Sequence, residues 1–287
     1  MSEEFLWSGA ADAARADAML TRSTRENFPV ALRMLPAGPR RHLMAVYGYA
    51  RITDDIGDEA PPADRPRLLD ELEADLLRLN GGEPRLPVIR ALAPTVHDLG
   101  VPLQPFLDLI SANRQDQIVN RYETFDDLLG YCKLSANPVG RIVLYVFGAY
   151  SEPRAALSDQ VCTALQLAEH WQDVAEDYRA GRVYVPAEDL DRFGVCPPDL
   201  AAPSASPRLR ELMTFETRRA SRLLDDGAPL VGTLGGMPRL AVAGYVAGGR
   251  AALAAIAAAG YDVLAEQATP GKGRTLAELL RAVVTGR

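Results

Sequence analysis

The second half of the first strongly helical segment reads RITDDIGDE over residues 51–59. Residues four apart lie on the same face of an α-helix, so Asp54 and Asp58 share a face. Arg51 and Tyr47 stand one and two turns earlier on that face. This stretch therefore predicts a long helix that presents two carboxylates, one cation and one phenol to the same side.

A second acidic run reads EHWQDVAED over residues 169–177 and repeats the arrangement. Glu169, Asp173 and Asp177 form a ladder at spacings of four on one predicted helix face, and His170 lies off that face. Apolar residues on a neighbouring flank, among them Trp171, indicate that this helix also contributes to the core. We interpret Trp171 as core packing.

Two ladders of like charge need an explanation, because each pair at this spacing destabilises a helix by about 0.2–0.5 kcal/mol. One cluster alone is explained equally well by a solvated acidic face. Two clusters beside apolar flanks favour a metal site, since carboxylates near a core persist when they are paired or bind a metal. Oxygen donors without cysteine suit Mg²⁺, which binds through a few carboxylates and substrate phosphates.

The rest of the chain favours helices throughout, because alternating β-branched runs are nearly absent and Ala, Leu, Arg and Glu dominate most segments. We predict an all-α fold. The expected helices are 40–58, 64–79, 88–99, 103–119, 124–149, 158–180, 207–226, 238–259 and 274–284.

The predicted helices form one domain over residues 1–287, in which 1–20 and 266–287 are peripheral. Asp64, Thr124 and Ser158 stand where N-terminal caps belong. Pro138 falls inside a helical pattern, where it indicates either a simple break after Ala136 or a functional kink.

Composition excludes several classes of protein. The formal charge is −7 from 31 basic and 38 acidic residues, which argues against a nucleic-acid binder. Three distant cysteines and no CxxC pair argue against a disulfide framework or a structural zinc site. The first twenty residues lack the pattern of a signal peptide, and the apolar stretches 240–249 and 251–261 are too short to span a membrane. We therefore expect a soluble, cytoplasmic protein.

Two facing carboxylate sets that hold Mg²⁺ suggest chemistry on a diphosphate. The metal would neutralise charge as the carbon–oxygen bond to diphosphate breaks. An apolar helical cavity would then shield an allylic carbocation and admit a long hydrocarbon tail.

At these residues the chain resembles the squalene/phytoene synthase family of the isoprenoid synthases, from about residue 26 to residue 264. The first aspartate motif of the family resembles DDIGD at 54–58. The second resembles DVAED at 173–177, followed by GRVYVP at 181–186. Between them, GYC at 130–132 and SANPVG at 135–140 resemble the segment that lines the family's central cavity.

Three details resemble one branch, the hydroxysqualene synthases of bacterial hopanoid pathways: ENFPV at 26–30, the pair at 137–138, and WQD at 171–173. Such enzymes ionise presqualene diphosphate and let water capture the rearranged cation. Relatives that form presqualene diphosphate or phytoene usually have Arg at Gln172 and Tyr at Gly249. Family members commonly have Asn where this chain has Glu169.

The resemblance implies roles for particular residues. It implies metal binding by the acidic side chains Asp54, Asp58, Glu169, Asp173 and Asp177. Catalysis would use the four aspartates together with Tyr47, Gln166 and Asn137. Substrate would contact Phe28, Arg51, Asn137, Gln166, Arg182 and Tyr184.

Some of these residues have plainer alternatives. Arg51 either contacts diphosphate or pairs with Asp54 and Asp55, and the motif favours contact. Asn137 either offers its amide to substrate or satisfies a carbonyl freed by the proline. Gln166 and Asn137 are the candidates for holding the quenching water.

The implied partners are Mg²⁺ and a prenyl diphosphate, either presqualene diphosphate or farnesyl diphosphate. A peripheral contact with the inner membrane face and a functional link to other squalene-pathway enzymes are further expectations, and no nucleic acid is expected. The first rival function is head-to-head joining of two farnesyl or geranylgeranyl diphosphates. The second is a catalytically silent family member that acts as an assembly protein.

Overall fold

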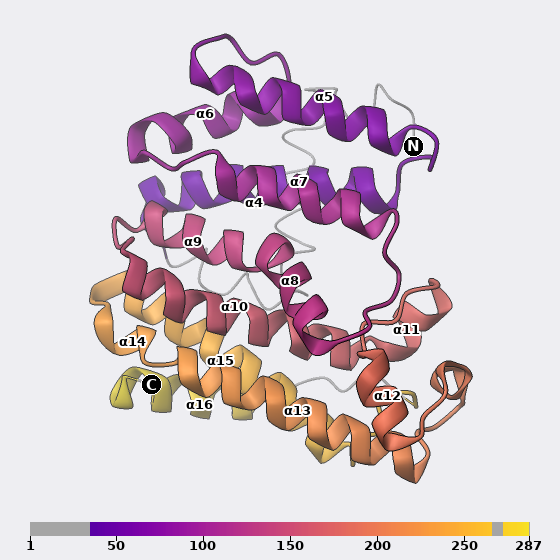
Figure 1. The fold of residues 1–287 in the computed structure, drawn as a ribbon. Helices are drawn as coiled ribbons and strands as arrows, with labels where there is room; N and C mark the ends of the chain where they lie inside the picture. Colours follow the sequence, from indigo (N-terminus) through magenta and orange to yellow (C-terminus); the bar gives the residue numbers. More distant parts are fainter. Residues whose placement is uncertain (1–34, 266–271, 287) are drawn as a thin grey trace. The chain divides into compact units, whose positions relative to one another are not determined.

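The computed structural model describes residues 35–265 and 272–286, and Figure 1 traces their course. These residues form helices joined by short loops, with one isolated β-bridge between Arg121 and Val183. The predicted all-α fold is confirmed. Phe28 and the motif at 26–30 lie outside the described residues.

Contacts gather the chain into two compact units. Of the described residues, the first unit takes 35–118 together with 138–150, and the second takes 119–137, 151–265 and 272–286. The assignment of residues 1–287 to a single domain stays a prediction. Each unit is described below by itself.

The first unit is built around α4 (Ala37–Asp58), which packs against α6 (Pro87–Leu99), α7 (Gln104–Asp116) and α5 (Arg65–Leu77). The short η2 (Arg78–Asn80) extends α5, and most of α9 (Asn137–Val146) also belongs here. Tyr49 ties α4 to α7, because its buried hydroxyl donates to the carbonyl of Phe106 at 2.9 Å while the two rings meet edge to face. The apolar face of α4 is thus fixed in the core, so its acidic end has a defined direction.

The second unit is centred on α10 (Glu152–Gln172), which packs most extensively against α13 (Pro207–Gly227) and then against α15 (Gly236–Ala258) (Figure 1). Trp171 is fully buried on α10, which confirms its interpretation as core packing. The other elements of this unit are α8 (Phe125–Ser135), α11 (Val174–Arg179), α12 (Ala187–Phe193), η3 (Pro197–Ala201), α14 (Leu230–Thr233) and α16 (Lys272–Thr285).

Helix α15 is long and apolar enough to cross a membrane by length and composition, but 61% of its most apolar 18-residue window is buried in the structure. Its glycines allow close packing. A Cβ at Gly249 would lie 2.7 Å from Leu165 Cδ2 on α10 and 2.9 Å from Leu224 Cδ2 on α13. The apolar character of α15 is therefore explained by its place among neighbouring helices.

Two predicted helices are interrupted. The expected helix 124–149 ends at Ser135 and a new helix starts at Asn137, so Pro138 follows a break at Ala136 rather than a kink. A proline near a helix start loses no intrahelical hydrogen bond, which makes this break inexpensive. The expected helix 158–180 is divided at Asp173, where α10 gives way to α11.

The predicted caps have mixed outcomes. Thr124 is confirmed, because its hydroxyl accepts from the Asp127 amide while the Asp127 carboxylate accepts from the Thr124 amide. Asp64 takes the N-cap position of α5 without a side-chain hydrogen bond. Ser158 is wrong as a cap, since it is buried inside α10, which starts after Ser151 with a proline in its first turn.

Candidate functional site

The first acidic motif ends α4 and projects from a helix whose other face is buried. Asp54 and Asp58 are solvent-exposed, while Ile56 and Gly57 between them are buried. Asn113 of α7 donates its amide Nδ2 to Asp54 Oδ1 at 3.1 Å. The sequence predicted the shared face of the two aspartates, and the structure confirms it.

Asp54 has a perturbed acidity. Its carboxylate is exposed but surrounded by enough protein that desolvation, followed by the negative charge of Asp58, raises its pKa to about 6 against the favourable bond from Asn113. Ionising this carboxyl costs free energy because it is desolvated and lies beside a like charge. A bound cation would offset that cost, so the position suits a cation site.

Arg51 has acidic partners one and two turns along. Its Nη2 lies 2.7 Å from Asp55 Oδ1 and 3.0 Å from Glu59 Oε1. The plainer alternative named Asp54 and Asp55, and the structure supports the Asp55 half of it. To contact a diphosphate, the Arg51 guanidinium would have to bind it in addition to its acidic partners or give up its bond to Glu59. That contact stays a prediction. Tyr47 is half-buried on the same helix.

The second acidic motif spans the junction of α10 and α11. The backbone turns at Asp173, yet the amide of Asp173 still bonds the Glu169 carbonyl at 3.0 Å, and the amide of Asp177 bonds the Asp173 carbonyl at 2.8 Å. The i to i+4 relationship of the three acidic residues is therefore preserved through the bend. Asp173 and Asp177 are half-buried, whereas Glu169 is exposed.

Asp177 titrates unusually for an aspartate. Desolvation and then the neighbouring charge of Asp173 raise its pKa to about 7, and Arg182 opposes this only in part. As with the first motif, like charges are crowded where water is partly excluded. A cation bound here would stabilise the charged form.

His170, which the sequence placed off the acidic face as a weak ligand candidate, lies at the centre of a group of polar and aromatic side chains. It is buried and stacks on Tyr184, with ring centroids 3.7 Å apart and 13° between the planes. Its Nδ1 lies 3.9 Å from Asp177 Oδ2, and its Nε2 lies 3.2 Å from Gln166 Nε2. Burial, followed by the charge of Arg182, lowers its pKa to about 3, so the ring is neutral. The spacing of seven residues between His170 and Asp177, two helical turns, was the signal available in the sequence.

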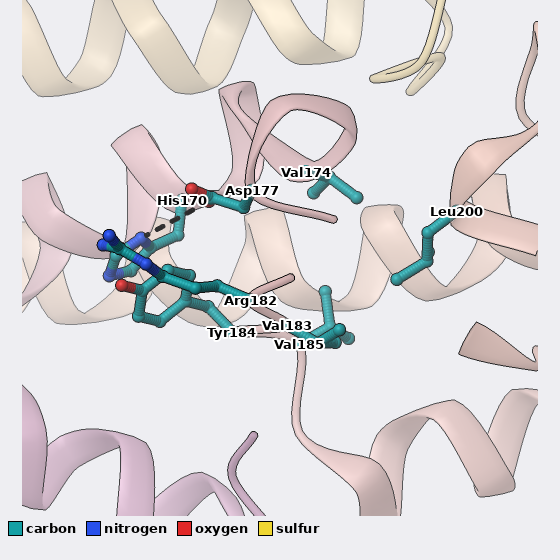
Figure 2. A pocket seen from close by; sticks show the side chains of 8 residues that line it. All are labelled: His170, Val174, Asp177, Arg182, Val183, Tyr184, Val185 and Leu200. Atoms are coloured by element: carbon teal, nitrogen blue, oxygen red, sulfur yellow. Dashed lines mark ion pairs between the residues drawn. The ribbon is translucent and has the colours of Figure 1, made fainter. Parts of the chain in front are cut away.

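Figure 2 shows a small pocket beside this histidine. Its volume of about 10 Å³ is close to the least that a cavity needs in order to hold one water molecule. His170, Asp177, Arg182 and Tyr184 line one part of it, and the remaining lining is aliphatic: Val174, Val183, Val185 and Leu200. The structure thus brings the second acidic motif together with the predicted substrate residues Arg182 and Tyr184.

An aromatic cluster continues from this pocket. Tyr184 also lies near Tyr131 and Tyr122, at centroid distances of 5.8 and 5.9 Å. The amide of Val183 bonds the Asn120 carbonyl at 2.8 Å, which fixes the segment after α11 against the start of this cluster. Tyr131 belongs to the GYC motif at 130–132, so two of the motifs named in the sequence meet in space.

Asn137 and Gln166 occupy different surroundings in the second unit. Asn137 is buried, and its Oδ1 accepts a hydrogen bond of 2.9 Å from Thr163 Oγ1 on α10. Gln166 stands one turn before His170 on the same helix. Their assignment to the quenching water stays a prediction.

The residues fit Mg²⁺ by their donor chemistry, although no three acidic, histidine or cysteine side chains form a ready metal centre within 35–265 and 272–286. Mg²⁺ usually keeps several waters and binds through one or two carboxylates plus substrate phosphates, so a dedicated protein cage is not required. Each motif offers carboxylates, and the raised pKa values of Asp54 and Asp177 are the expected cost of unneutralised acidic sites. Bound Mg²⁺ would neutralise negative charge on a departing diphosphate.

The comparisons with known proteins show which family the chain is similar to. The model of the squalene/phytoene synthase family matches residues 21–274. A hydroxysqualene synthase of Rhodopseudomonas palustris is 39% identical over 209 residues, which cover 71% of this chain and 70% of that protein. The crystal structure of squalene synthase HpnC from Alicyclobacillus acidocaldarius matches with a TM-score of 0.78 and 44% identity over 85% of this chain and 92% of that chain.

A dehydrosqualene synthase solved with a ligand matches with a TM-score of 0.84 and 26% identity over 96% of both chains. The all-α fold that the chain shares with these proteins, together with the names of its relatives, defines an isoprenoid synthase, and the protein is an enzyme of that class. Within the class, the chain belongs to the squalene/phytoene synthase family. The alternative of a catalytically silent member is thereby set aside.

Proposed function

We propose that this enzyme converts presqualene diphosphate into hydroxysqualene, with Mg²⁺ bound by its two acidic motifs. In this reaction the carbon–oxygen bond to diphosphate breaks and the cation rearranges. A water oxygen then bonds to carbon and releases a proton. Presqualene diphosphate is the substrate of the branch that the sequence resembles, and the packing around Gly249 supports membership of that branch.

Gly249 is the observation that carries the choice of reaction. Relatives that join two prenyl diphosphates tend to have Tyr at this position. Here even a Cβ would approach Leu165 and Leu224 to within 3.0 Å, so a tyrosine would need both leucine side chains to move. The packing around position 249 is thus adapted to a residue without a side chain, which supports a branch that does not use that tyrosine.

Several groups of the second unit are suited to the diphosphate. Arg182 carries a guanidinium, which suits phosphate oxygens because it presents several N–H donors in a fixed plane. Tyr184 is held by its stack on His170. The neutral His170 adds no charge to the Asp177 carboxylate, so that carboxylate remains available to a cation.

The rival reaction is the head-to-head joining of two prenyl diphosphates. It is favoured by the name of the structural relative from Alicyclobacillus, which is described as a squalene synthase. If the product were squalene, a terminating hydride would be needed from a nicotinamide cofactor.

Product analysis separates the two reactions. The purified enzyme is incubated with Mg²⁺ and either presqualene diphosphate or farnesyl diphosphate, with and without a nicotinamide cofactor. Hydroxysqualene formed from presqualene diphosphate alone, with no product from farnesyl diphosphate, supports our proposal. Presqualene diphosphate, squalene or phytoene formed from shorter diphosphates would establish the rival.

We further place the expected membrane contact on α16. Leu280 and Val284 are 60% and 80% exposed, stand one turn apart, and flank the exposed Arg281. Apolar and basic residues side by side on a helix favour binding to an anionic lipid surface. The segment 272–287 has one acidic residue, Glu278, and four basic ones: Lys272, Arg274, Arg281 and Arg287.

Vesicle flotation tests this placement. Vesicles with phosphatidylglycerol should retain the natural protein and lose the Leu280→Asp, Val284→Asp variant, while pure phosphatidylcholine vesicles retain little of either. Leu77→Asp changes an exposed leucine of α5 and serves as the control. Binding that survives the double change would contradict a contact through α16.

A further inference from the structure

Asn113 is a buried polar residue that the predicted mechanism does not use. It lies on α7, is 7% exposed, and comes 59 residues after Asp54 in the sequence. Both hydrogens of its side-chain amide have acceptors: Asp54 Oδ1 at 3.1 Å and the carbonyl of Leu109, one turn earlier, at 3.2 Å. The nitrogen is thus fixed between two oxygens.

The opposite side of the same amide explains a glycine in the first aspartate motif. A Cβ on Gly57 would lie 2.1 Å from Asn113 Oδ1 and 3.1 Å from its Cγ. The amide oxygen therefore occupies the space that a side chain at position 57 would fill. Reversing the amide would set its oxygen against the carboxylate and the Leu109 carbonyl, so the observed orientation is the only one that satisfies both acceptors.

A second residue of α7 supports the same end of α4. Gln117 donates Nε2 to the carbonyls of Gly57 at 3.2 Å and Asn113 at 2.9 Å. Arg65 donates to its Oε1 at 2.9 Å. Gln117 thus holds the helix backbone, whereas Asn113 donates to the carboxylate of Asp54.

From these contacts we propose that Asn113 is a positioning residue for Asp54, and that Gly57 is required because it makes room for the Asn113 amide. The donated hydrogen bond fixes one carboxylate oxygen and orients the other for a divalent cation. This inference rests on the proposed binding of Mg²⁺ by the first motif. Partners that orient a metal ligand typically change metal affinity or activity 10–100-fold when they are removed.

The test compares variants in two assays. The first measures the Mg²⁺ concentration that gives half of the rise in melting temperature in the presence of inorganic diphosphate. The second measures the Mg²⁺ concentration for half-maximal turnover, and kcat at saturating Mg²⁺. Asn113→Leu keeps the branched shape of the side chain and removes the donor, so we expect both Mg²⁺ half-points to rise about tenfold.

Gln117→Leu is the matched control. It removes hydrogen bonds from the same helix contact without touching Asp54, so it should lower the melting temperature and leave both Mg²⁺ half-points unchanged. An equal rise in the half-points of Gln117→Leu and Asn113→Leu would mean that any loosening of α7 is sufficient, and would overturn the proposal.

A double-mutant cycle tests the link to the glycine. Gly57→Ala should displace the amide and raise the Mg²⁺ half-points as Asn113→Leu does. In an Asn113→Ala background, where the space is already free, Gly57→Ala should add little, because the two changes act on one contact. Independent, additive effects would overturn the role assigned to Gly57.

Failure of this inference can be told apart from failure of the proposed function. If Mg²⁺ and diphosphate stabilise the natural protein and Asp54→Asn weakens that effect, metal binding by the motif stands. Normal half-points in Asn113→Leu would then reject the positioning role alone. If Asp54→Asn leaves the Mg²⁺ half-point unchanged, the assignment of the motif to metal fails, and the positioning role fails with it.

Discussion

His170 lies flat against Tyr184, with 3.7 Å between ring centroids, and its two nitrogens face Asp177 of the second acidic motif and Gln166 one turn earlier on α10. The stack fixes the ring, and the ring in turn stands beside Asp177. A histidine that is buried and neutral can orient a carboxylate without cancelling its charge. This contact links the packing of the second unit to its proposed chemistry.

Two substitutions separate packing from polarity at His170. His170→Ala should cost about 3 kcal/mol of unfolding free energy, as truncation of a buried ring does. His170→Phe keeps the ring and should leave stability within about 1 kcal/mol, but it removes the nitrogens and should lower kcat. Denaturant unfolding and steady-state kinetics measure both. Full activity in His170→Phe would show that only the packing matters.

The acidic motifs should be needed for turnover and not for folding. Asp54→Asn and Asp173→Asn each remove a proposed ligand, and a metal contributes several kcal/mol of charge stabilisation, so kcat should fall more than about a hundredfold. Melting temperatures without Mg²⁺ should stay level or rise, because repulsion within each motif is relieved. A large loss of stability with activity retained would make these aspartates structural.

Glu169 should lower the Mg²⁺ concentration that the enzyme needs for half-saturation. It stands one turn before Asp173, is exposed, and raises the local negative charge where relatives commonly have Asn. Glu169→Asn should retain activity but raise the Mg²⁺ half-point about fivefold, since one charge at close range in water is worth about 1 kcal/mol. A Mg²⁺ titration that does not move would place the Glu169 side chain away from the metal.

The helical architecture could be predicted from sequence because periodicity and punctuation act locally. Most helix ends differ from expectation by one to three residues, as at α4 and α15. The break at Ala136 was one of the two alternatives that Pro138 indicated, whereas the interruption at Asp173 was missed, because the apolar pattern continues across it. Ser158 was misassigned for a related reason: a serine inside α10 can be buried without capping anything.

The acidic residues of the site could also be predicted, since spacing of four on one helix is a local property. Asn113 could not, because nothing in the sequence indicates which residue of α7 meets Asp54 across two packed helices. The Gly57 position carried a hint, as a glycine inside a strong helix is unfavourable unless a neighbour needs the space. Identifying that neighbour required the structure.

A buried ionic cluster formed by residues outside the acidic motifs gives the enzyme a pH-dependent stability. Arg219 on α13 bonds Asp189 of α12 at 2.8 Å and lies 3.4 Å from Glu216, whose side chain is fully buried. Burial, only partly offset by Arg219, raises the pKa of Glu216 to about 8. A carboxyl with a raised folded-state pKa binds a proton more strongly when folded, so its stabilising effect is complete below its unfolded value and lost as pH rises through about 8.

Glu216→Gln should remove that dependence. Relative to the natural protein, the variant should gain about 2 kcal/mol of unfolding free energy between about pH 6 and pH 8, at 1.36 kcal/mol per pKa unit. Glu211→Gln changes an exposed residue of the same helix and is the control. A stability difference between natural protein and Glu216→Gln that stays constant with pH would contradict the titration.

The side-chain amides of Gln166 and Asn137 should determine which product forms from the carbocation. Gln166 Nε2 lies 3.2 Å from Nε2 of the neutral His170 ring. Asn137 is buried, and its side-chain oxygen Oδ1 accepts a hydrogen bond from Thr163. Amides of this kind can orient a water molecule without forming an ion pair with a cation. Excluding other water is what protects a reactive intermediate from early capture.

Replacing Gln166 or Asn137 with Leu should therefore shift products from hydroxysqualene to premature alcohols or eliminated hydrocarbons, with diphosphate release largely kept. Thr163→Val removes only the hydrogen bond to the side-chain oxygen of Asn137. If that side-chain amide orients the water, this variant should shift the product ratio less than Asn137→Leu does. Reactions of presqualene diphosphate in ¹⁸O-labelled water, analysed by mass spectrometry, measure both product ratio and label. If both leucine variants make only hydroxysqualene with normal label, the water is held by other groups, and neither amide determines the outcome.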